Sequence, residues 1–341
     1  GLILLVSFGV MAGMYFLDYS FIGRYATAIY WGMTIVFFTI RIMSSEINGR
    51  YPVMLMLVYL YVPAYAGLLY QLRGRGYGAV VKGIAIQVLT AGAAYYLSNI
   101  LHAAFAVYLM QMVLLLLAVR KGWFAVNKRD AAVVIVTVLV IIPLAACLFL
   151  LVTVPAEADN YRLRRIQAWL HPSEDPYGAG YTYMWIRQGL AKSKLIGVYE
   201  GFSFDDEITW LVPRTDPFIL IEIVFTFGIL IGILVVAALA ALIIHAFGIV
   251  RRQKNQLGFM ISAACFMVFL DNCLEGVLIN TGCFPVTSVQ LPFLSYGVGS
   301  TVTYAVFIGL LLSIHRNEKI VTDYTVTGRP VWRLNIRLEK K

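Results

Sequence analysis

The chain has 341 residues, of which 60% are hydrophobic and 13% are charged, and it carries a net charge of +9 at pH 7. Soluble proteins are roughly 45–50% apolar and about 25% charged, so this composition excludes an ordinary soluble domain and indicates an integral membrane protein. The basic residues are spread over the ends of many apolar segments instead of forming one patch. We therefore expect no nucleic acid as a partner and favour anionic membrane lipids.

Apolar segments of about 17–25 residues, the length that crosses the hydrocarbon core, recur along the chain. They predict about nine membrane-spanning helices at residues 2–17, 26–43, 51–72, 79–97, 101–119, 131–154, 217–250, 257–280 and 295–315. We expect an all-α polytopic membrane protein. Its predicted parts are membrane helices at 1–155, a long extracytoplasmic loop at 156–216, further membrane helices at 217–316 and a basic cytoplasmic tail at 317–341.

The positions of Lys and Arg in the short loops predict the orientation of the chain. Arg24, Arg73, Lys121 and Arg251 fall on one side of the predicted spans, together with the basic tail. This side is expected to be cytoplasmic. With an odd number of spans Gly1 lies outside, and because a span begins there at once, we expect the numbering to start within a longer natural chain.

Residues 155–216 form the one long stretch of low hydropathy, and a loop of this length without its own fold is usually functional. Residues 161–170 have the pattern of a short amphipathic helix, with Arg165 away from its apolar side. Its arginines either contact lipid headgroups or hold the pyrophosphate of a lipid-linked sugar, which a planar guanidinium binds in two places. Prolines and glycines predict an irregular turn at 171–181.

Two further patterns lie at the expected outer ends of spans. Thr215-Asp216-Pro217 places a carboxylate at the N-cap of a predicted helix with proline directly after it, which a purely structural cap also explains. Pro285 and Pro292 forbid a continuous helix over residues 284–300. We expect this turn to be a packing element, since its small residues allow close helix approach and it contains no strong acid or base.

The loop and the turn together resemble the SEDS family, the RodA, FtsW and SpoVE proteins of peptidoglycan synthesis. The turn is similar to the family signature Pro-Val-Thr-Gly-x-x-Leu-Pro-Phe-x-Ser-Tyr-Gly-Gly-Ser, with Ser288 and Val298 in place of two glycines. The family's loop pattern is matched by Tyr161, Arg165, Ile166, Pro172, Asp175, Pro176, Gly178, Gly180 and Tyr181. The segment from Trp210 to Glu222 is similar to the one that carries the family's essential carboxylate, which here is Asp216.

The resemblance implies a SEDS-type helical bundle, with a further span before Gly1, in the cytoplasmic membrane of a bacterium. It implies a peptidoglycan glycosyltransferase that uses lipid II in elongation, division or sporulation and works with a class B penicillin-binding protein. By this resemblance Asp216 is the catalytic base, and the substrate-binding candidates are Arg165, Arg187, Arg214 and Tyr181. The sequence shows no metal-ligand spacing, and the cofactor stays open, with Mg²⁺ or Mn²⁺ as one option.

Two family motifs are missing, which keeps two alternatives open. Residues 61–67 retain Pro63 of a Gln-Pro-Ser-Glu-x-x-Lys motif but neither of its charges, and residues 97–102 have no counterpart of Gln-Pro-Asp-x-Gly-Thr. One alternative is a catalytically silent SEDS scaffold for a class B penicillin-binding protein. The other is a lipid-linked-sugar transporter, in which intramembrane charges mark the pathway.

Ionisable residues within the spans form the last pattern. Asp271 and Glu275 lie one helical turn apart, which is typical either of a pair that binds a cation or a sugar or of two groups wetted near the outer surface. In the transporter alternative they mark the pathway. His102, near the end of another span, is expected to be an interfacial group whose hydrogen bonds are satisfied.

Overall fold

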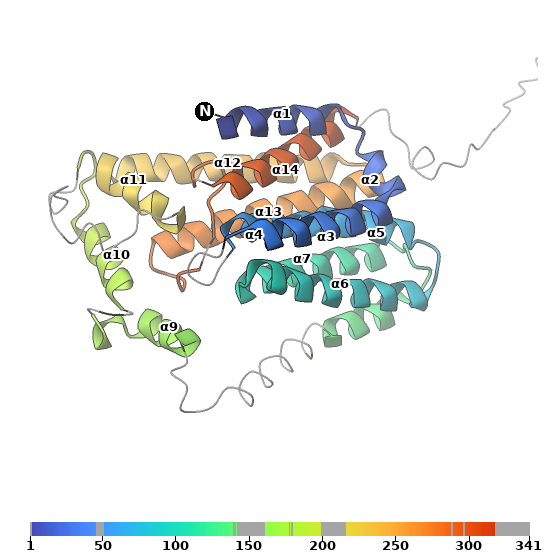
Figure 1. Cartoon of the computed structure of the whole chain (residues 1–341), viewed down its shortest axis with the longest axis horizontal. Helices are drawn as coiled ribbons and strands as arrows, with labels where there is room; N and C mark the ends of the chain where they lie inside the picture. Colours follow the sequence, from blue (N-terminus) through green and yellow to red (C-terminus); the bar gives the residue numbers. More distant parts are fainter. Residues whose placement is uncertain are drawn as a thin grey trace, which may run out of the picture.

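The structure is a computed structural model that describes residues 2–45, 51–138, 141, 161–176, 178, 180–198, 216–287, 289–295 and 297–317. Its long helices lie side by side in one bundle, and two shorter helices, α9 and α10, lie at one end of it (Figure 1). The helices are α1 (Leu2–Phe16), α2 (Ser20–Arg24), α3 (Ala26–Met43), α4 (Pro52–Leu57), α5 (Tyr61–Gln71), α6 (Tyr77–Ser98), α7 (Leu101–Arg120), α9 (Tyr161–Leu170), α10 (Tyr181–Lys192), α11 (Ile219–Phe227), α12 (Ile229–Arg252), α13 (Gln256–Asn280) and α14 (Val298–Arg316). Short 3-10 turns are η1 (Val58–Leu60), η2 (Pro172–Glu174) and η4 (Asp216–Phe218).

Seven of the described segments are long and apolar enough to cross a membrane, and the shorter α1 is apolar as well. The predicted span at 131–154 lies largely outside the described residues, which continue there to 138 and include 141. The described spans follow the predicted order along the chain. The expected all-α, multi-pass membrane architecture is confirmed.

Small residues bring the helices together, as is usual where lipid supplies no hydrophobic driving force between them. α1 packs along α14, where a Cβ on Gly309 would lie 2.7 Å from the carbonyl oxygen of Met11. The start of α14 meets α4 in the same way, because a Cβ on Gly299 would lie 2.6 Å from the carbonyl oxygen of Val53. Larger side chains at these two glycines would push the helices apart.

Buried polar side chains cross between neighbouring helices. The amide of Gln87 in α6 donates to the carbonyl oxygen of Tyr108 in α7 at 2.9 Å. The hydroxyl of Tyr65 in α5 donates to the carbonyl oxygen of Gly83 in α6 at 3.0 Å. Such bonds average about 0.6 kcal/mol in membrane bundles, so they specify neighbours more than they add stability.

The predicted single span over residues 217–250 is wrong, because the chain breaks at Gly228 between α11 and α12. Gly228 has φ 99° and ψ 166°, a conformation that residues with a Cβ rarely adopt. After the break, α12 runs beside α11, so that Leu220 and Leu239 share one hydrophobic cluster. The apolar composition continues through the break, which is why the spacing of apolar residues predicts one helix here.

Backbone hydrogen bonds to the long loop satisfy the chain on both sides of this break. The amide of Ile229 donates to the carbonyl oxygen of Lys194 at 3.0 Å, and the amide of Gly197 donates to the carbonyl oxygen of Phe227 at 3.1 Å. Backbone groups at membrane depth must find partners within the protein. Residues 194–197 therefore anchor the loop to the start of α12.

The predicted interruption between the last two spans is confirmed, and its centre is a tight turn. The amide of Leu294 donates to the carbonyl oxygen of Leu291 at 3.3 Å. Pro292 and Phe293 lie between them, and Phe293 has φ 63°, which is strained for a bulky residue. The hydroxyl oxygen of Ser295 supports the turn by accepting from the amide of Leu291 at 2.9 Å.

Candidate functional site

Segments that are far apart in the sequence meet at the end of the bundle where α9 and α10 lie (Figure 1). The predicted amphipathic helix at 161–170 is confirmed as α9, and the irregular turn after it contains the short η2. The indole of Trp169 in α9 donates to the carbonyl oxygen of Gly282 at 3.3 Å. The hydroxyl of Tyr183 in α10 accepts from the amide of Val286 at 3.0 Å. The long loop is thus bound to the segment that follows α13.

Asp216 opens η4. The prediction that Asp216 is the N-cap of an α-helix is wrong, since α11 begins later and has Phe218 as its N-cap. Asn280 at the end of α13 takes a capping role instead. It accepts from the amide of Ile221 at 2.9 Å and donates to the carbonyl oxygen of Pro217 at 2.6 Å. Because the first amides of a helix have no partner within it, Asn280 fixes the segment that carries Asp216.

The structure describes the four predicted substrate-binding residues to different extents. Arg187 is exposed on α10 beside the end of α13, where a Cβ on Gly282 would lie 3.8 Å from its Cγ. Tyr181 opens α10 and packs against the hydrophobic cluster that includes η4. Its hydroxyl is buried and has no hydrogen-bond partner in the described part of the chain. Arg165 lies in α9 and Arg214 lies outside the described residues, so all four substrate-binding roles stay predictions.

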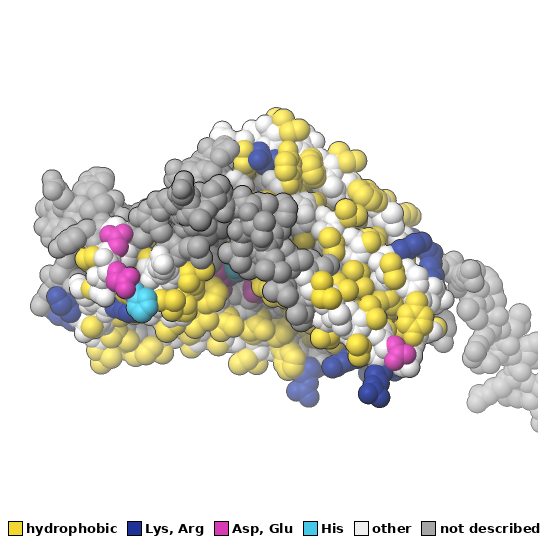
Figure 2. All heavy atoms as spheres, turned by 90° about the horizontal axis from the view of Figure 1, so that it is seen from below, with side chains coloured by type: hydrophobic (Ala, Val, Ile, Leu, Met, Phe, Trp, Pro, Cys, Tyr) yellow, Lys and Arg dark blue, Asp and Glu magenta, His cyan; other side chains and the backbone are white. Residues whose placement is uncertain are grey.

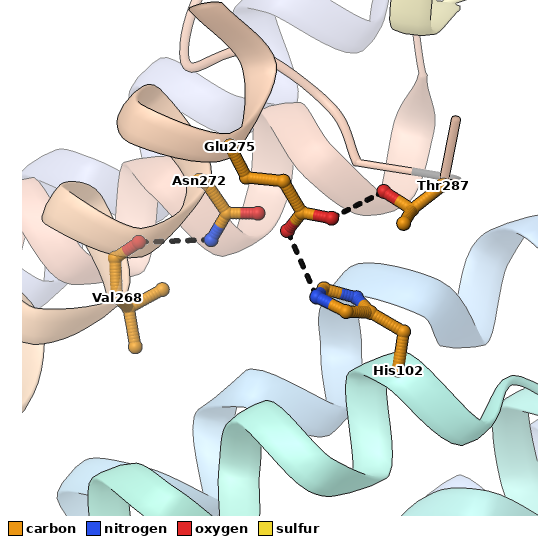
Figure 3. A network of polar contacts seen from close by, with 5 residues as sticks. All are labelled: His102, Val268, Asn272, Glu275 and Thr287. Atoms are coloured by element: carbon orange, nitrogen blue, oxygen red, sulfur yellow. Dashed lines mark hydrogen bonds and ion pairs between the residues drawn. The ribbon is translucent and has the colours of Figure 1, made fainter. Parts of the chain in front are cut away.

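A polar network joins α7, α13 and the turn after α13, and it brings together ionisable residues whose pairing the sequence does not predict. His102 stands in the first turn of α7, Glu275 in α13 and Thr287 in the turn (Figure 3). Glu275 Oε2 lies 3.0 Å from His102 Nε2, and the hydroxyl of Thr287 donates to Glu275 Oε1. The side chain of Glu275 is 6% exposed and that of His102 is 30% exposed. A carboxylate buried this far needs a partner, and a protonated His102 supplies the opposite charge.

Asp271 adds a second carboxylate one turn from Glu275 on the same side of α13. Its Oδ2 atom is buried and has no hydrogen-bond partner among the described residues, although the carboxylate lies close enough to His102 and Glu275 to interact electrostatically. The face seen in Figure 2 is largely apolar, and few acidic side chains are visible on it. The cluster holds more acidic than basic groups, unlike the arginine-rich segments of the loop.

The expectation that His102 is a satisfied group near the end of a span is borne out, since it is partly exposed in the first turn of α7 and its imidazole pairs with a carboxylate of α13. Of the two interpretations of the acidic pair, the wetted one does not fit Glu275, which is buried. One signal was present in the sequence: α13 contains two acids and no Lys or Arg. A basic partner therefore has to come from another helix, but which helix depends on packing that local sequence does not encode.

Comparison with known proteins identifies the family. The sequence profile of the FtsW, RodA and SpoVE proteins, described as "Cell cycle protein", matches residues 65–320. Stage V sporulation protein E of Bacillus subtilis is 27% identical over 159 residues, which cover 47% of this chain and 43% of that protein. Peptidoglycan glycosyltransferase MrdB of Escherichia coli is 26% identical over 164 residues, which cover 48% of this chain and 44% of that protein. The matched region is less than half the length of these curated relatives.

Solved structures share the fold over nearly the whole chain. A chain of a peptidoglycan synthase complex that coordinates polymerization and crosslinking superimposes with a TM-score of 0.68 at 18% identity, covering 93% of this chain and 89% of that one. Rod shape determining protein RodA of Thermus thermophilus superimposes with a TM-score of 0.56 at 15% identity, covering 93% of this chain and 87% of that one. Because the family profile spans most of the chain and these structures share its helical bundle, the protein belongs to the FtsW, RodA and SpoVE family of cell cycle proteins.

Proposed function

We propose that the chain is a peptidoglycan polymerase that builds glycan strands from lipid II at the outer face of the bacterial cytoplasmic membrane. One observation carries the proposal: the family match includes η4, and Asn280 holds this turn at the end of α13, beside which Arg187 of α10 also lies. Relatives in the family are named peptidoglycan glycosyltransferases. Asp216 and Arg187 would supply the carboxylate and a cation that glycosyl transfer from a pyrophosphate requires.

In the proposed reaction, the 4-hydroxyl oxygen of the acceptor sugar forms a bond to the anomeric carbon of the donor. The bond between that carbon and undecaprenyl pyrophosphate breaks, with inversion, and the pyrophosphate takes the electron pair. The carboxylate of Asp216 takes the hydroxyl proton as general base. Arg165, Arg187 and Arg214 are the proposed partners of the leaving pyrophosphate, because guanidinium groups bind phosphate oxygens in pairs.

A divalent cation is a second way to neutralise the pyrophosphate. The described residues contain no group of three or more His, Cys, Asp or Glu side chains that would hold a metal ion by themselves. Mg²⁺ is commonly held by one or two carboxylates together with substrate phosphates, so Mg²⁺ or Mn²⁺ would depend on Asp216 and the pyrophosphate. No step of the reaction above is routed through the metal.

The proposed orientation places the C-terminus in the cytoplasm and the η4 end of the bundle outside. Arg75, Lys121 and Lys254 are exposed in the loops that connect the helices at their other ends. These loops meet, since the guanidinium of Arg73 donates to the side-chain oxygen of Gln256 at 3.1 Å. Short loops rich in Lys and Arg favour the cytoplasmic side.

Purified protein supplied with fluorescent lipid II tests the proposal, with and without a class B penicillin-binding protein. We expect glycan chains from the parent protein and almost none from Asp216→Asn, because the amide cannot take a proton and general-base catalysis is typically worth about 10²–10⁴-fold. Asp175→Asn, which changes another carboxylate of the loop, is the matched control and should do less harm. Equal polymerisation by Asp216→Asn and the parent chain would refute Asp216 as the base. No glycan from the parent chain, with or without the penicillin-binding protein, would remove the polymerase assignment.

A catalytically silent scaffold for the penicillin-binding protein is the second candidate. The observation that favours it is the segment Val53–Gln71, which is largely buried and carries no charged residue where the family motif carries Glu and Lys. A scaffold would bind the purified penicillin-binding protein while making no glycan, and Asp216→Asn would leave that binding unchanged. Co-purification of the two proteins, run beside the polymerisation assay, separates the two candidates.

A further inference from the structure

We propose that His102, Asp271 and Glu275 form a binding site for the sugar part of the lipid-linked substrate, separate from Asp216. The site takes neutral hydroxyl and amide groups that donate hydrogen bonds. This inference rests on the proposed function. The site would bind the sugar of the substrate, whereas the arginines would bind its pyrophosphate.

The charges of the cluster define its ligand. Two carboxylates lie beside one imidazole, so the cluster disfavours a phosphate group. Ionised carboxylates only accept hydrogen bonds, and a ligand must therefore donate them. Sugar hydroxyls and acetamido N–H groups are such donors, whereas a pyrophosphate offers only acceptors. A metal cage is not favoured, because the described residues contain no group of three side chains suited to one.

Asp271 offers an acceptor that the protein leaves unused. Its Oδ2 atom is buried without a hydrogen-bond partner in the part of the chain that the structure describes, and such atoms are costly to leave unpaired. Glu275 is already held by His102 and Thr287, so its orientation is fixed. A fixed carboxylate next to an unpaired one is prepared for a ligand without further rearrangement. His102 is 30% exposed, so the cluster can be reached from the surface of the described part of the chain.

The cluster and η4 are positioned by the same helix. Asn280, which holds η4, follows Glu275 by five residues in α13, which is about 7.5 Å along the helix axis at 1.5 Å per residue. Thr287 connects the cluster to the turn that contacts α10. A single substrate can therefore place its sugar toward α7 and α13 and its pyrophosphate toward α10.

Binding of two ligands to the purified full chain tests the site. The ligands are lipid II and undecaprenyl pyrophosphate, which lacks the sugars. Asp271→Asn and Glu275→Gln should weaken binding of lipid II about tenfold or more, the effect of losing a hydrogen bond to a charged group, and leave binding of undecaprenyl pyrophosphate unchanged. Arg187→Gln should weaken both. Asp130→Asn, which changes an exposed carboxylate in the helical turn just before the sixth predicted span, is the matched control and should change neither.

The two ligands separate a lost sugar contact from a damaged fold. If Asp271→Asn weakens binding of both ligands equally, or of neither, the sugar site is refuted. A variant whose thermal unfolding shows misfolding is replaced by Asp271→Ser, to which the same criterion applies. A parent protein that polymerises lipid II while Asp271→Asn retains full affinity refutes this site alone. A parent protein that binds no lipid II refutes both the site and the proposed function.

Discussion

The bonds from Asn280 to η4 and α11 can be tested by removing its side chain. In Asn280→Ala the buried amide of Ile221 loses its acceptor, and an unpaired buried amide costs about 1–3 kcal/mol. The carbonyl oxygen of Pro217 loses a donor at 2.6 Å, which adds about 0.5–1.5 kcal/mol. We expect a loss of about 2–4 kcal/mol, confined to the docking of η4 and α11 because the other helices of the bundle keep their contacts.

Hydrogen–deuterium exchange measures this local opening. A loss of about 2–4 kcal/mol corresponds to roughly 30- to 700-fold faster exchange in α11, with exchange in the middle of α13 unchanged. Asn272→Ala is the matched control. It removes another buried asparagine of α13, whose amide donates within the same helix to Val268, so exchange of α11 should stay unchanged. Unchanged exchange of α11 in Asn280→Ala would refute the capping role of Asn280.

Three further predictions follow from the backbone and the charge pattern. Gly228→Ala should lower the thermal unfolding midpoint because of its positive φ, while Gly248→Ala, where a Cβ would meet no atom within 4 Å, should not. Pro292→Leu should reduce the amount of folded protein in the membrane before it changes specific activity, and normal protein levels with lost function would mean that this turn contacts substrate. An impermeant thiol reagent should label a cysteine at exposed Lys192 from outside but not one at exposed Lys254, and the reverse result would overturn the orientation.

The spans can be predicted from the sequence because each depends on its own local composition. The predicted helix at 26–43 coincides with α3, and the one at 101–119 with all but the last residue of α7. Local composition does not predict the break at Gly228, because apolar side chains continue on both sides of it and glycine is common within membrane helices. The helix ends at Gly228 because of the backbone conformation of this residue, which composition does not predict.

The candidate site also has one part that the sequence predicts and another that it does not. Motif spacing and topology place Arg187 and η4 at one end of the bundle, and the structure agrees. The pairing of His102 with Glu275 was not predictable, because it requires α7 and α13 to be neighbours although a long stretch of sequence separates them. The capping of α11 by Asn280 was not predictable for the same reason. The local pattern favours Asp216 as the N-cap, whereas the amide of Ile221 is bonded by Asn280, which is far away in the sequence.

The pairing of residues 194–197 with Phe227 and Ile229 is made by main-chain atoms on both sides. Side chains at 194–196 can therefore change during evolution without loosening this joint, provided that the backbone keeps its path. Gly197 is the exception, because its φ of 98° favours glycine. The joint that holds the loop against the start of α12 thus constrains the conformation of a short backbone segment more than it constrains its sequence.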